Sequence, residues 1–357
     1  MSADTRPLLA VTLGDPAGIG PEITARTLAD PASVRAARGL AVGDAAVLER
    51  AARICGLDVE INAVSDPGQA RFTEGVIDVL DLGIAGADLE WGKVDPVAGR
   101  AAVAAIETAT RLALDGVADA VVTAPINKEA IWAAGSKHLG HTEMLGELTG
   151  STRHNTMFVV RGLKIFFTTR HMSLRDALDR LSEQVVEEAI REAYAALRVF
   201  GADGRTPRLA VAAVNPHGGE NGNFGDEEIV SIAPAVAAAR AAGLDVTGPV
   251  PADSVFHQGL EGRYDGVLSH FHDQGHIPAK TVDFHGTVSV TVGLPILRTS
   301  VDHGTAFDIA GTGTASPGPW PPRSAPPSSS PPTPTASAPS TPPADRPTPR
   351  AEGTHPR

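Results

Sequence analysis

Short apolar runs alternate with helical segments over most of this chain. The first run, Leu8–Leu13, is followed by a glycine-rich loop and by a helix that should contain Pro21 in its first turn. Further strand and helix candidates follow at Leu40–Val42, Ala46–Ile54, Val59–Val64, Val76–Leu82 and Pro96–Leu114, the last a long alanine-rich helix. Such alternation is typical of an α/β domain. We therefore predict an α/β fold.

Polar residues follow the predicted buried strand Asp119–Val122. Thr123, Asn127 and Lys128 would lie beyond its carboxyl end, where open α/β sheets usually bind ligands. Asn127 could equally cap the helix that begins there. The strand end is therefore a candidate binding position.

The segment LGHTEMLGEL places His141 and Thr142 before a helical run. Thr142 could be the N-cap of that helix, whereas His141 could face a ligand at the helix start. Both roles stay open from the sequence.

Three histidines, His171, His217 and His272, each follow a predicted strand by a few residues. The strands are Lys164–Thr168, which should form a hairpin with Thr156–Val160, then Leu209–Val214 and Tyr264–Leu268. Three imidazoles at strand ends would suit a catalytic metal site with open positions. The spacing alone is only moderately specific, because the three ligands are far apart in the sequence. For any single histidine, a hydrogen-bonded core position is the commoner alternative.

The stretch from His270 to Gly313 holds the densest polar chemistry of the chain. Its imidazoles and carboxylates suit a borderline divalent metal, whereas Lys280 and Arg298 suit a phosphorylated or carboxylated ligand. A metal together with an anion indicates an enzyme.

Composition limits the classes of partner. The net charge of −12 argues against nucleic acid, so an anionic ligand must be held by local positive charge. No secretory segment follows Met1 and no apolar run reaches ~18 residues, so we expect a cytoplasmic protein without a membrane partner. The single cysteine, Cys55, cannot form an internal disulfide and should be a buried small hydrophobe.

The glycine-rich loop does not indicate a nucleotide fingerprint. Gly14, Gly18 and Gly20 do not have the dinucleotide-binding spacing, and the loop lacks the Lys-Ser/Thr ending of a P-loop. A simple Rossmann domain is therefore not predicted.

The sequence changes character after Gly313. Fifteen of the 29 prolines lie in Ser316–Arg357, which contains scarcely an aliphatic residue. Such a segment cannot bury enough apolar surface to order itself, so we exclude residues 316–357 from the fold as a disordered tail or a frame-error segment. A proline-rich partner ligand is a further alternative.

Seven motifs occur in order, namely GDPAGIGPE, TAPINKEA, GHTEML, NPHGGE, PADSVF, HDQGHIPAK and GLPILRTSVDHGTAFDIAG. With them the chain closely resembles the 4-hydroxythreonine-4-phosphate dehydrogenase family. The resemblance implies an α/β/α architecture similar to isocitrate and isopropylmalate dehydrogenases, with residues 1–315 forming two subdomains. It also implies a homodimer whose active sites lie in the cleft between subdomains and are completed by the partner subunit.

The resemblance also implies roles for individual residues. The family's metal ligands fall on His171, His217 and His272, the same three residues that follow the predicted strands. The implied substrate-binding residues are His141, Thr142, Asp253, Lys280, Ser289 and Arg298. The loop HGTAFDIAGTG resembles the adenine-side loop of related dehydrogenases, so Asp302, His303, Gly304 and Asp308 are expected to bind the cofactor. The chain departs from the family pattern at Ser289, where Asn is usual, and at Arg170, which stands within the usual Thr-Thr-His motif.

The implied reaction oxidises the C3 hydroxyl of a 4-phosphorylated 3-hydroxy acid with NAD or NADP, followed by decarboxylation. One divalent ion (Zn, Mg, Co or Mn) on the three histidines would act as a Lewis acid, and Lys280 would join them as a catalytic residue. ENGNFGDEE, HDQGHIP and HGTAFDIA are more similar to the subgroup that uses D-threonate or D-erythronate 4-phosphate. A non-catalytic metal- or sugar-phosphate-binding homologue is the alternative. An isocitrate-type enzyme is disfavoured, because those sites bind metal through aspartates.

Overall fold

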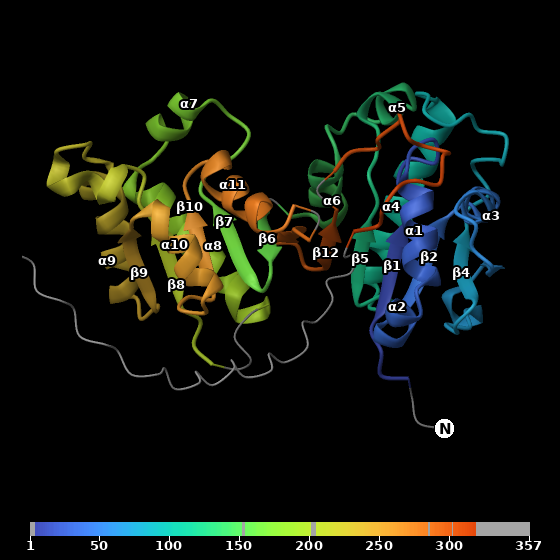
Figure 1. Ribbon diagram of the computed structural model, residues 1–357, viewed down its shortest axis with the longest axis horizontal. Helices are drawn as coiled ribbons and strands as arrows, with labels where there is room; N and C mark the ends of the chain where they lie inside the picture. Colours follow the sequence, from blue (N-terminus) through green and yellow to red (C-terminus); the bar gives the residue numbers. More distant parts are fainter. Residues whose placement is uncertain (1–3, 152–153, 201–204, 285, 302, 319–357) are drawn as a thin grey trace, which may run out of the picture. The chain divides into compact units, whose positions relative to one another are not determined.

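The computed structural model describes residues 4–151, 154–200, 205–284, 286–301 and 303–318. Within them the strands form one sheet in the order β3-β4-β2-β1-β5-β12-β11-β6-β7-β10-β8-β9 (Figure 1). The strands are β1 (Leu8–Thr12), β2 (Arg38–Gly43), β3 (Glu60–Val64), β4 (Val76–Asp81), β5 (Ala120–Thr123), β6 (Asn155–Val160), β7 (Leu163–Phe167), β8 (Leu209–Ala212), β9 (Val246–Val250), β10 (Gly266–Ser269), β11 (Val288–Val292) and β12 (Leu297–Ser300).

The helices are α1 (Gly20–Ala29), α2 (Pro31–Ala36), α3 (Ala45–Ile54), α4 (Pro96–Leu114), α5 (Lys128–Ala133), α6 (His141–Thr149), α7 (Leu174–Asp179), α8 (Glu183–Phe200), α9 (Ala233–Ala241), α10 (Ala252–Leu260) and α11 (His272–Val282). A short 3₁₀ turn forms η1 (Pro67–Gln69), and a π-helical turn forms η3 (Glu228–Ile232). The segment η2 (Pro216–Gly222) consists of tight turns with left-handed backbone at residues 217–221. No helix of the described residues is both long and apolar enough to cross a bilayer.

The sheet joins two groups of parallel strands. Strands β1 to β5 and β12 run parallel to one another, and β7 to β10 form the second parallel group. Between them lie β11, antiparallel to β12 and β6, and β6, antiparallel to β7. Because β7, β10 and β8 are parallel neighbours, the segments that follow their carboxyl ends leave the same edge of the sheet.

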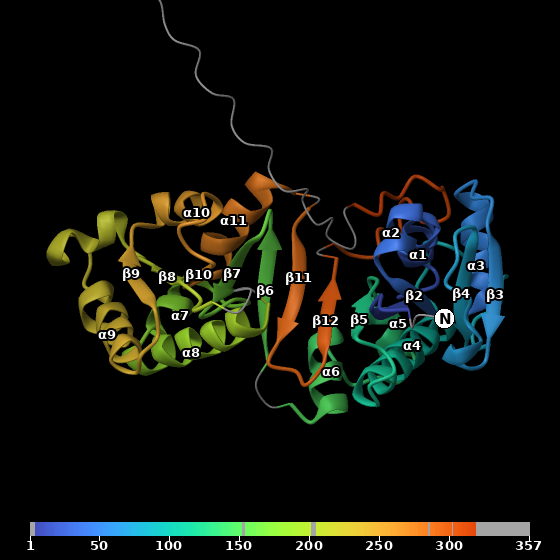
Figure 2. The same cartoon turned by 90° about the horizontal axis from the view of Figure 1, so that it is seen from below.

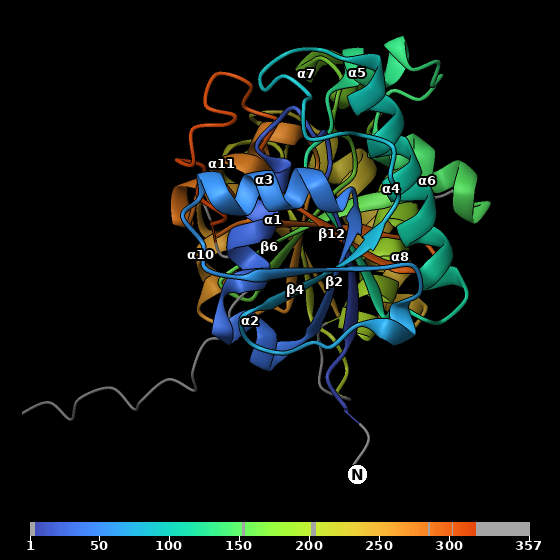
Figure 3. The same ribbon diagram turned by 90° about the vertical axis from the view of Figure 1, so that its right-hand side faces the viewer.

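Helices cover both faces of each parallel group. In β8, Leu209 and Val211 pack with α8 and α9, whereas Ala210 and Ala212 pack with α10 and α11 on the opposite face (Figure 2). In the first group, α1 and α3 lie to one side of β2 and α4 lies to the other (Figure 3). This α/β/α layering confirms the predicted fold class.

Most predicted elements are confirmed, with two corrections. The predicted helix at Pro96–Leu114 is α4, and the hairpin that turns at Arg161 is β6–β7. Strands β9, β11 and β12 were not predicted. The chain after η2 forms the π turn η3 first, and helix α9 starts at Ala233, because Pro234 has no N–H for the helical ladder. Cys55 is half-buried rather than buried, at the end of α3. Residues 319–357, most of the predicted tail, lie outside the described residues.

Helices α4 and α5 pack closely at Gly99. A Cβ at Gly99 would overlap the backbone carbonyl of Ala130 in α5. Helix α5 begins at Lys128 and is capped by Asn127, whose Oδ1 accepts from the backbone N–H of Ala130 at 2.9 Å. The contact therefore fixes the position of the residues that follow β5.

We expect Gly99→Ala to lower the free energy of unfolding by ~1–3 kcal/mol, because the added methyl group must push α5 away. Chemical denaturation would measure the loss. The matched control is Gly86→Ala, whose Cβ would meet nothing within 4 Å. Equal stability of the two variants would contradict the packing argument.

Candidate active site

Arg298 is a buried cation that is hydrogen-bonded to hydroxyl groups. Its side chain comes from β12 and is only 6% exposed. The guanidinium donates to the Thr123 hydroxyl, from Nε at 3.1 Å and from a terminal nitrogen at 2.6 Å, and to the Thr291 hydroxyl at 3.1 Å. No carboxylate of the described residues pairs with it. Burial lowers the pKa of Arg298 to about 10, so it still carries its proton at neutral pH.

His141 lies within electrostatic range of Arg298. Its Nε2 is buried and has no hydrogen-bond partner among the described residues. Burial holds the pKa of His141 well below 6.5, and the positive charge of Arg298 makes a smaller contribution in the same direction. The ring is therefore neutral. Helix α6 begins at His141 after Gly140, and Thr142 lies in its first turn. The N-cap alternative for Thr142 is therefore wrong, whereas the cap alternative for Asn127 is confirmed.

The imidazoles of His171 and His272 lie side by side, with ring centroids 5.8 Å apart. Burial lowers the pKa of His171, and the charges of Arg170, His272 and Lys128 lower it further, with Glu143 opposing them. Lys128 and Glu143 belong to α5 and α6, the two helices that follow β5 in the chain. Charges from the part of the chain that follows the first parallel group of strands therefore act on His171. We call His171 and His272 the imidazole pair.

The third predicted metal ligand, His217, is placed differently. Its side chain is 67% exposed. It stands in η2, where residues 217–221 have positive φ values between 45° and 81°. The described residues contain no group of three His, Cys, Asp or Glu side chains gathered closely enough to hold a metal ion. One chain therefore brings two of the three histidines together.

The donor chemistry nonetheless fits a divalent metal. Nδ1 of His272 lies 2.7 Å from a carboxylate oxygen of Asp273, and Nδ1 of His217 lies 3.1 Å from one of Glu220. A carboxylate on one ring nitrogen is the usual partner of a metal-ligating histidine, because it orients the ring and leaves Nε2 as the donor. His272 also stacks on His276 at 3.6 Å, which holds its ring further.

A pocket of about 380 Å³ lies between the end of α11 and the segment of residues 300–318. Lys280, His303 and Gly304 line it together with apolar residues, and Lys280 Nζ lies 5.4 Å from the centroid of the Phe284 ring. The glycine-rich loop also reaches this pocket, because Ile19 lines it and donates its N–H to the carbonyl of Thr305 at 3.0 Å. The structure thus brings together two of the four predicted cofactor residues and Lys280.

The remaining predicted residues are less closely involved. Asp308 is exposed and does not line this pocket, and Asp302 lies outside the described residues. Ser289 is half-buried on β11, paired with Ser300 of β12. Asp253 is exposed in the first turn of α10, which packs beside η2.

Asp15 is a site candidate that the sequence argument missed. It is 0% exposed, and its Oδ1 accepts from the backbone N–H of Ala17 at 2.8 Å, while its Oδ2 has no partner among the described residues. Burial raises the pKa of Asp15 to about 6, and the nearby charge of Asp95 adds to this. Only its place in the glycine-rich loop GDPAGIGPE could have indicated it.

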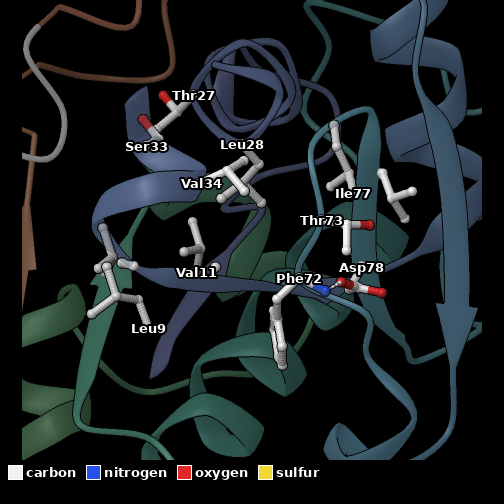
Figure 4. A pocket seen from close by; sticks show the side chains of 14 residues that line it. Leu9, Val11, Thr27, Leu28, Ser33, Val34, Phe72, Thr73, Ile77 and Asp78 are labelled. Carbon is white, nitrogen blue, oxygen red and sulfur yellow. Dashed lines mark hydrogen bonds between the residues drawn. The ribbon is translucent and has the colours of Figure 1, made fainter. Parts of the chain in front are cut away.

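A second cavity, of about 40 Å³, lies under α1 and α2 (Figure 4). Its walls are mostly apolar and include Leu9, Val11, Leu28 and Phe72. The carboxylate of Asp78 faces backbone N–H groups, accepting from Phe72 at 2.8 Å. We interpret this cavity as a packing void rather than a site.

Comparison with known proteins decides the family. The family described as "Pyridoxal phosphate biosynthetic protein PdxA" matches residues 35–320. The chain belongs to the PdxA family. It is 58% identical to a protein of Cutibacterium acnes named "Putative D-threonate 4-phosphate dehydrogenase", over 87% of this chain and 90% of the relative. A protein of the same name from Symbiobacterium thermophilum is 52% identical, over 88% and 93% of the two chains.

Solved structures agree with this membership. A 4-hydroxythreonine-4-phosphate dehydrogenase from Klebsiella pneumoniae is 46% identical with a TM-score of 0.81, and covers 88% of this chain and 95% of its own. One from Burkholderia phymatum is 43% identical with a TM-score of 0.80 and the same coverage. The predicted resemblance is therefore confirmed, and the relatives' names support an oxidoreductase of the dehydrogenase class for this PdxA-family chain.

The buried charge of Arg298 yields a prediction about stability. Arg298→Met should leave the unliganded protein as stable as the wild type or more so, because it removes an unpaired buried charge. The same variant should lose the rise in melting temperature that a 4-phosphorylated ligand gives the wild type. Thermal melts with and without the ligand would measure both effects.

Arg205→Met is the contrasting control, because Arg205 pairs with the buried carboxylate of Asp265. We expect this variant to lose ~1–3 kcal/mol of stability. A similar loss in unliganded Arg298→Met would show that Arg298 is a structural residue.

Proposed function

We propose that this protein oxidises the C3 hydroxyl of a 4-phosphorylated 3-hydroxy acid and transfers the hydride to NAD or NADP. The resulting β-keto acid would then lose carbon dioxide. The candidate substrates are D-threonate 4-phosphate, D-erythronate 4-phosphate and 4-hydroxythreonine 4-phosphate. The proposal rests on the buried guanidinium of Arg298, with which no carboxylate in the described part of the chain pairs. The names of the relatives at 58% and 52% identity favour D-threonate 4-phosphate.

The residues around Arg298 would bind the phosphate. A guanidinium donates to two oxygens of an anion at once, and the Thr123 and Thr291 hydroxyls hold its plane. Nε2 of neutral His141 could donate a further hydrogen bond, and the start of α6 favours a negative charge. In a chain of net charge −12 this local arrangement would offset the general repulsion of an anion.

The imidazole pair would hold the divalent ion together with His217. When bound, such an ion would supply Lewis-acid stabilisation of the negative charge that develops at the C3 oxygen. Asp273 and Glu220 would keep the Nε2 atoms of His272 and His217 as donors. Because His217 is apart from the pair in one chain, we infer that it serves the site of the partner subunit in a homodimer.

The pocket between α11 and residues 300–318 would hold the nicotinamide cofactor. His303 and Gly304 would contact its adenine side, and Ile19 would offer an apolar wall. Lys280 stands in the same pocket and would bind an anionic end of the substrate near the cofactor. These roles fit the expected active site between two subdomains.

The direct test is reduction of NAD or NADP by the three 4-phosphates, followed by absorbance with purified metal-loaded protein. We expect reduction with at least one 4-phosphate, loss of activity after chelation, and recovery when a divalent metal is added back. Protein that binds the 4-phosphates but reduces neither cofactor would be the non-catalytic homologue instead.

The inferred sharing of the metal site predicts a specific pattern of complementation. His217→Ala and His272→Ala should each be inactive, whereas their mixture should regain about a quarter of wild-type activity, because half of randomly formed dimers have one complete site. A mixture of His171→Ala and His272→Ala should stay inactive, because those side chains come together within one chain. Complementation in the second mixture, or none in the first, would contradict the inference.

A further inference from the structure

Arg170 stands directly before His171 at the imidazole pair. No hydrogen bond or ion pair joins its guanidinium to the residues that the structure describes, and its side chain is half-buried. The preceding residue is fixed, because Thr169 donates to the carbonyl of His270 from its N–H at 3.2 Å and from its hydroxyl at 2.7 Å. The backbone therefore holds a charged group beside the candidate metal ligands, and no partner for that group is found among the described residues.

Besides Lys280 in the cofactor pocket, the described part of the candidate site has two further cationic positions. One is Arg298, which is buried and hydrogen-bonded to two neutral hydroxyl groups. The other is Arg170, which is half-buried and directly precedes His171. Lys128 adds to the second position, because its charge also reaches His171, but it is exposed. A 4-phosphorylated acid has two anionic ends, a phosphate and a carboxylate. Two separated cations therefore match its charge distribution.

The candidate substrates differ at the carbon between the carboxylate and C3. D-Threonate 4-phosphate has a hydroxyl at C2, whereas 4-hydroxythreonine 4-phosphate has an ammonium group there. With the phosphate at Arg298 and C3 at the imidazole pair, C2 is one bond from the atom that the pair faces. A guanidinium beside that position attracts the carboxylate and repels a neighbouring ammonium group.

We propose that Arg170 is a specificity-determining residue that selects a 4-phosphorylated 2-hydroxy acid over the corresponding 2-amino acid. The inference rests on the proposed function, because it assumes that the phosphate binds at Arg298. Arginine suits the role, since its planar fork binds a carboxylate bidentately and its charge persists at any working pH.

The test compares Arg170→Met, Arg170→Gln and Arg170→Lys with wild type. For each protein, calorimetry gives the dissociation constants of the two 4-phosphates, and steady-state assays give kcat/KM for both. Arg170→Met and Arg170→Gln should each reduce the preference for D-threonate 4-phosphate by ~10- to 100-fold, mainly by weakening its binding. Arg170→Lys should keep most of the preference. Arg198→Met, on the exposed side of α8, is the matched control and should change neither constant.

Two results would overturn the inference. One is a wild-type protein that binds the 2-amino acid as tightly as the 2-hydroxy acid. The other is an unchanged ratio of dissociation constants in both neutral variants, including a parallel loss for the two ligands, which indicates a structural role. If the wild type oxidises neither compound, the proposed reaction fails, but the binding ratios still decide the role of Arg170.

Discussion

The burial of Arg298 between two threonine hydroxyls is the constraint on which the candidate site depends. A guanidinium that is 6% exposed and bonded to neutral hydroxyls, with no carboxylate partner among the described residues, is costly to bury, and a bound anion would lower that cost. Thr123 ends β5 and Thr291 lies on β11, so the arrangement exists only because β12 runs between these two strands. The position of the buried charge thus follows from the order of the strands.

The antiparallel strands at the centre of the sheet connect the two parts of this site. Strand β12 pairs with β5, and β11 pairs with β12 and β6. The chain from Val288 to Ser300 therefore joins two parallel groups whose other strands come earlier in the sequence. The first group supplies Thr123 and Lys128, and the second supplies the imidazole pair. This division is consistent with a substrate whose phosphate and C3 hydroxyl bind to different groups of strands.

The sequence predicted the parts of the structure that local patterns determine. Alternating apolar runs indicated most strands and helices, and the rule that polar residues follow strand ends selected His171 and His272, because β7 and β10 are neighbours. It could not predict β12, since Arg298 is charged and its pairing with β5 spans a long stretch of chain. Nor could it place His217, because a run of left-handed backbone in η2 turns this loop in a way that strand-end spacing does not encode. The buried state of Asp15 likewise depends on contacts beyond its own segment.

A crystal structure of the protein with D-threonate 4-phosphate and a divalent metal would show where the phosphate binds. We expect phosphate oxygens within about 3 Å of the Arg298 guanidinium and of His141 Nε2, with the C3 oxygen toward His171 and His272. A phosphate bound elsewhere, with Arg298 still hydrogen-bonded only to Thr123 and Thr291, would contradict this expectation.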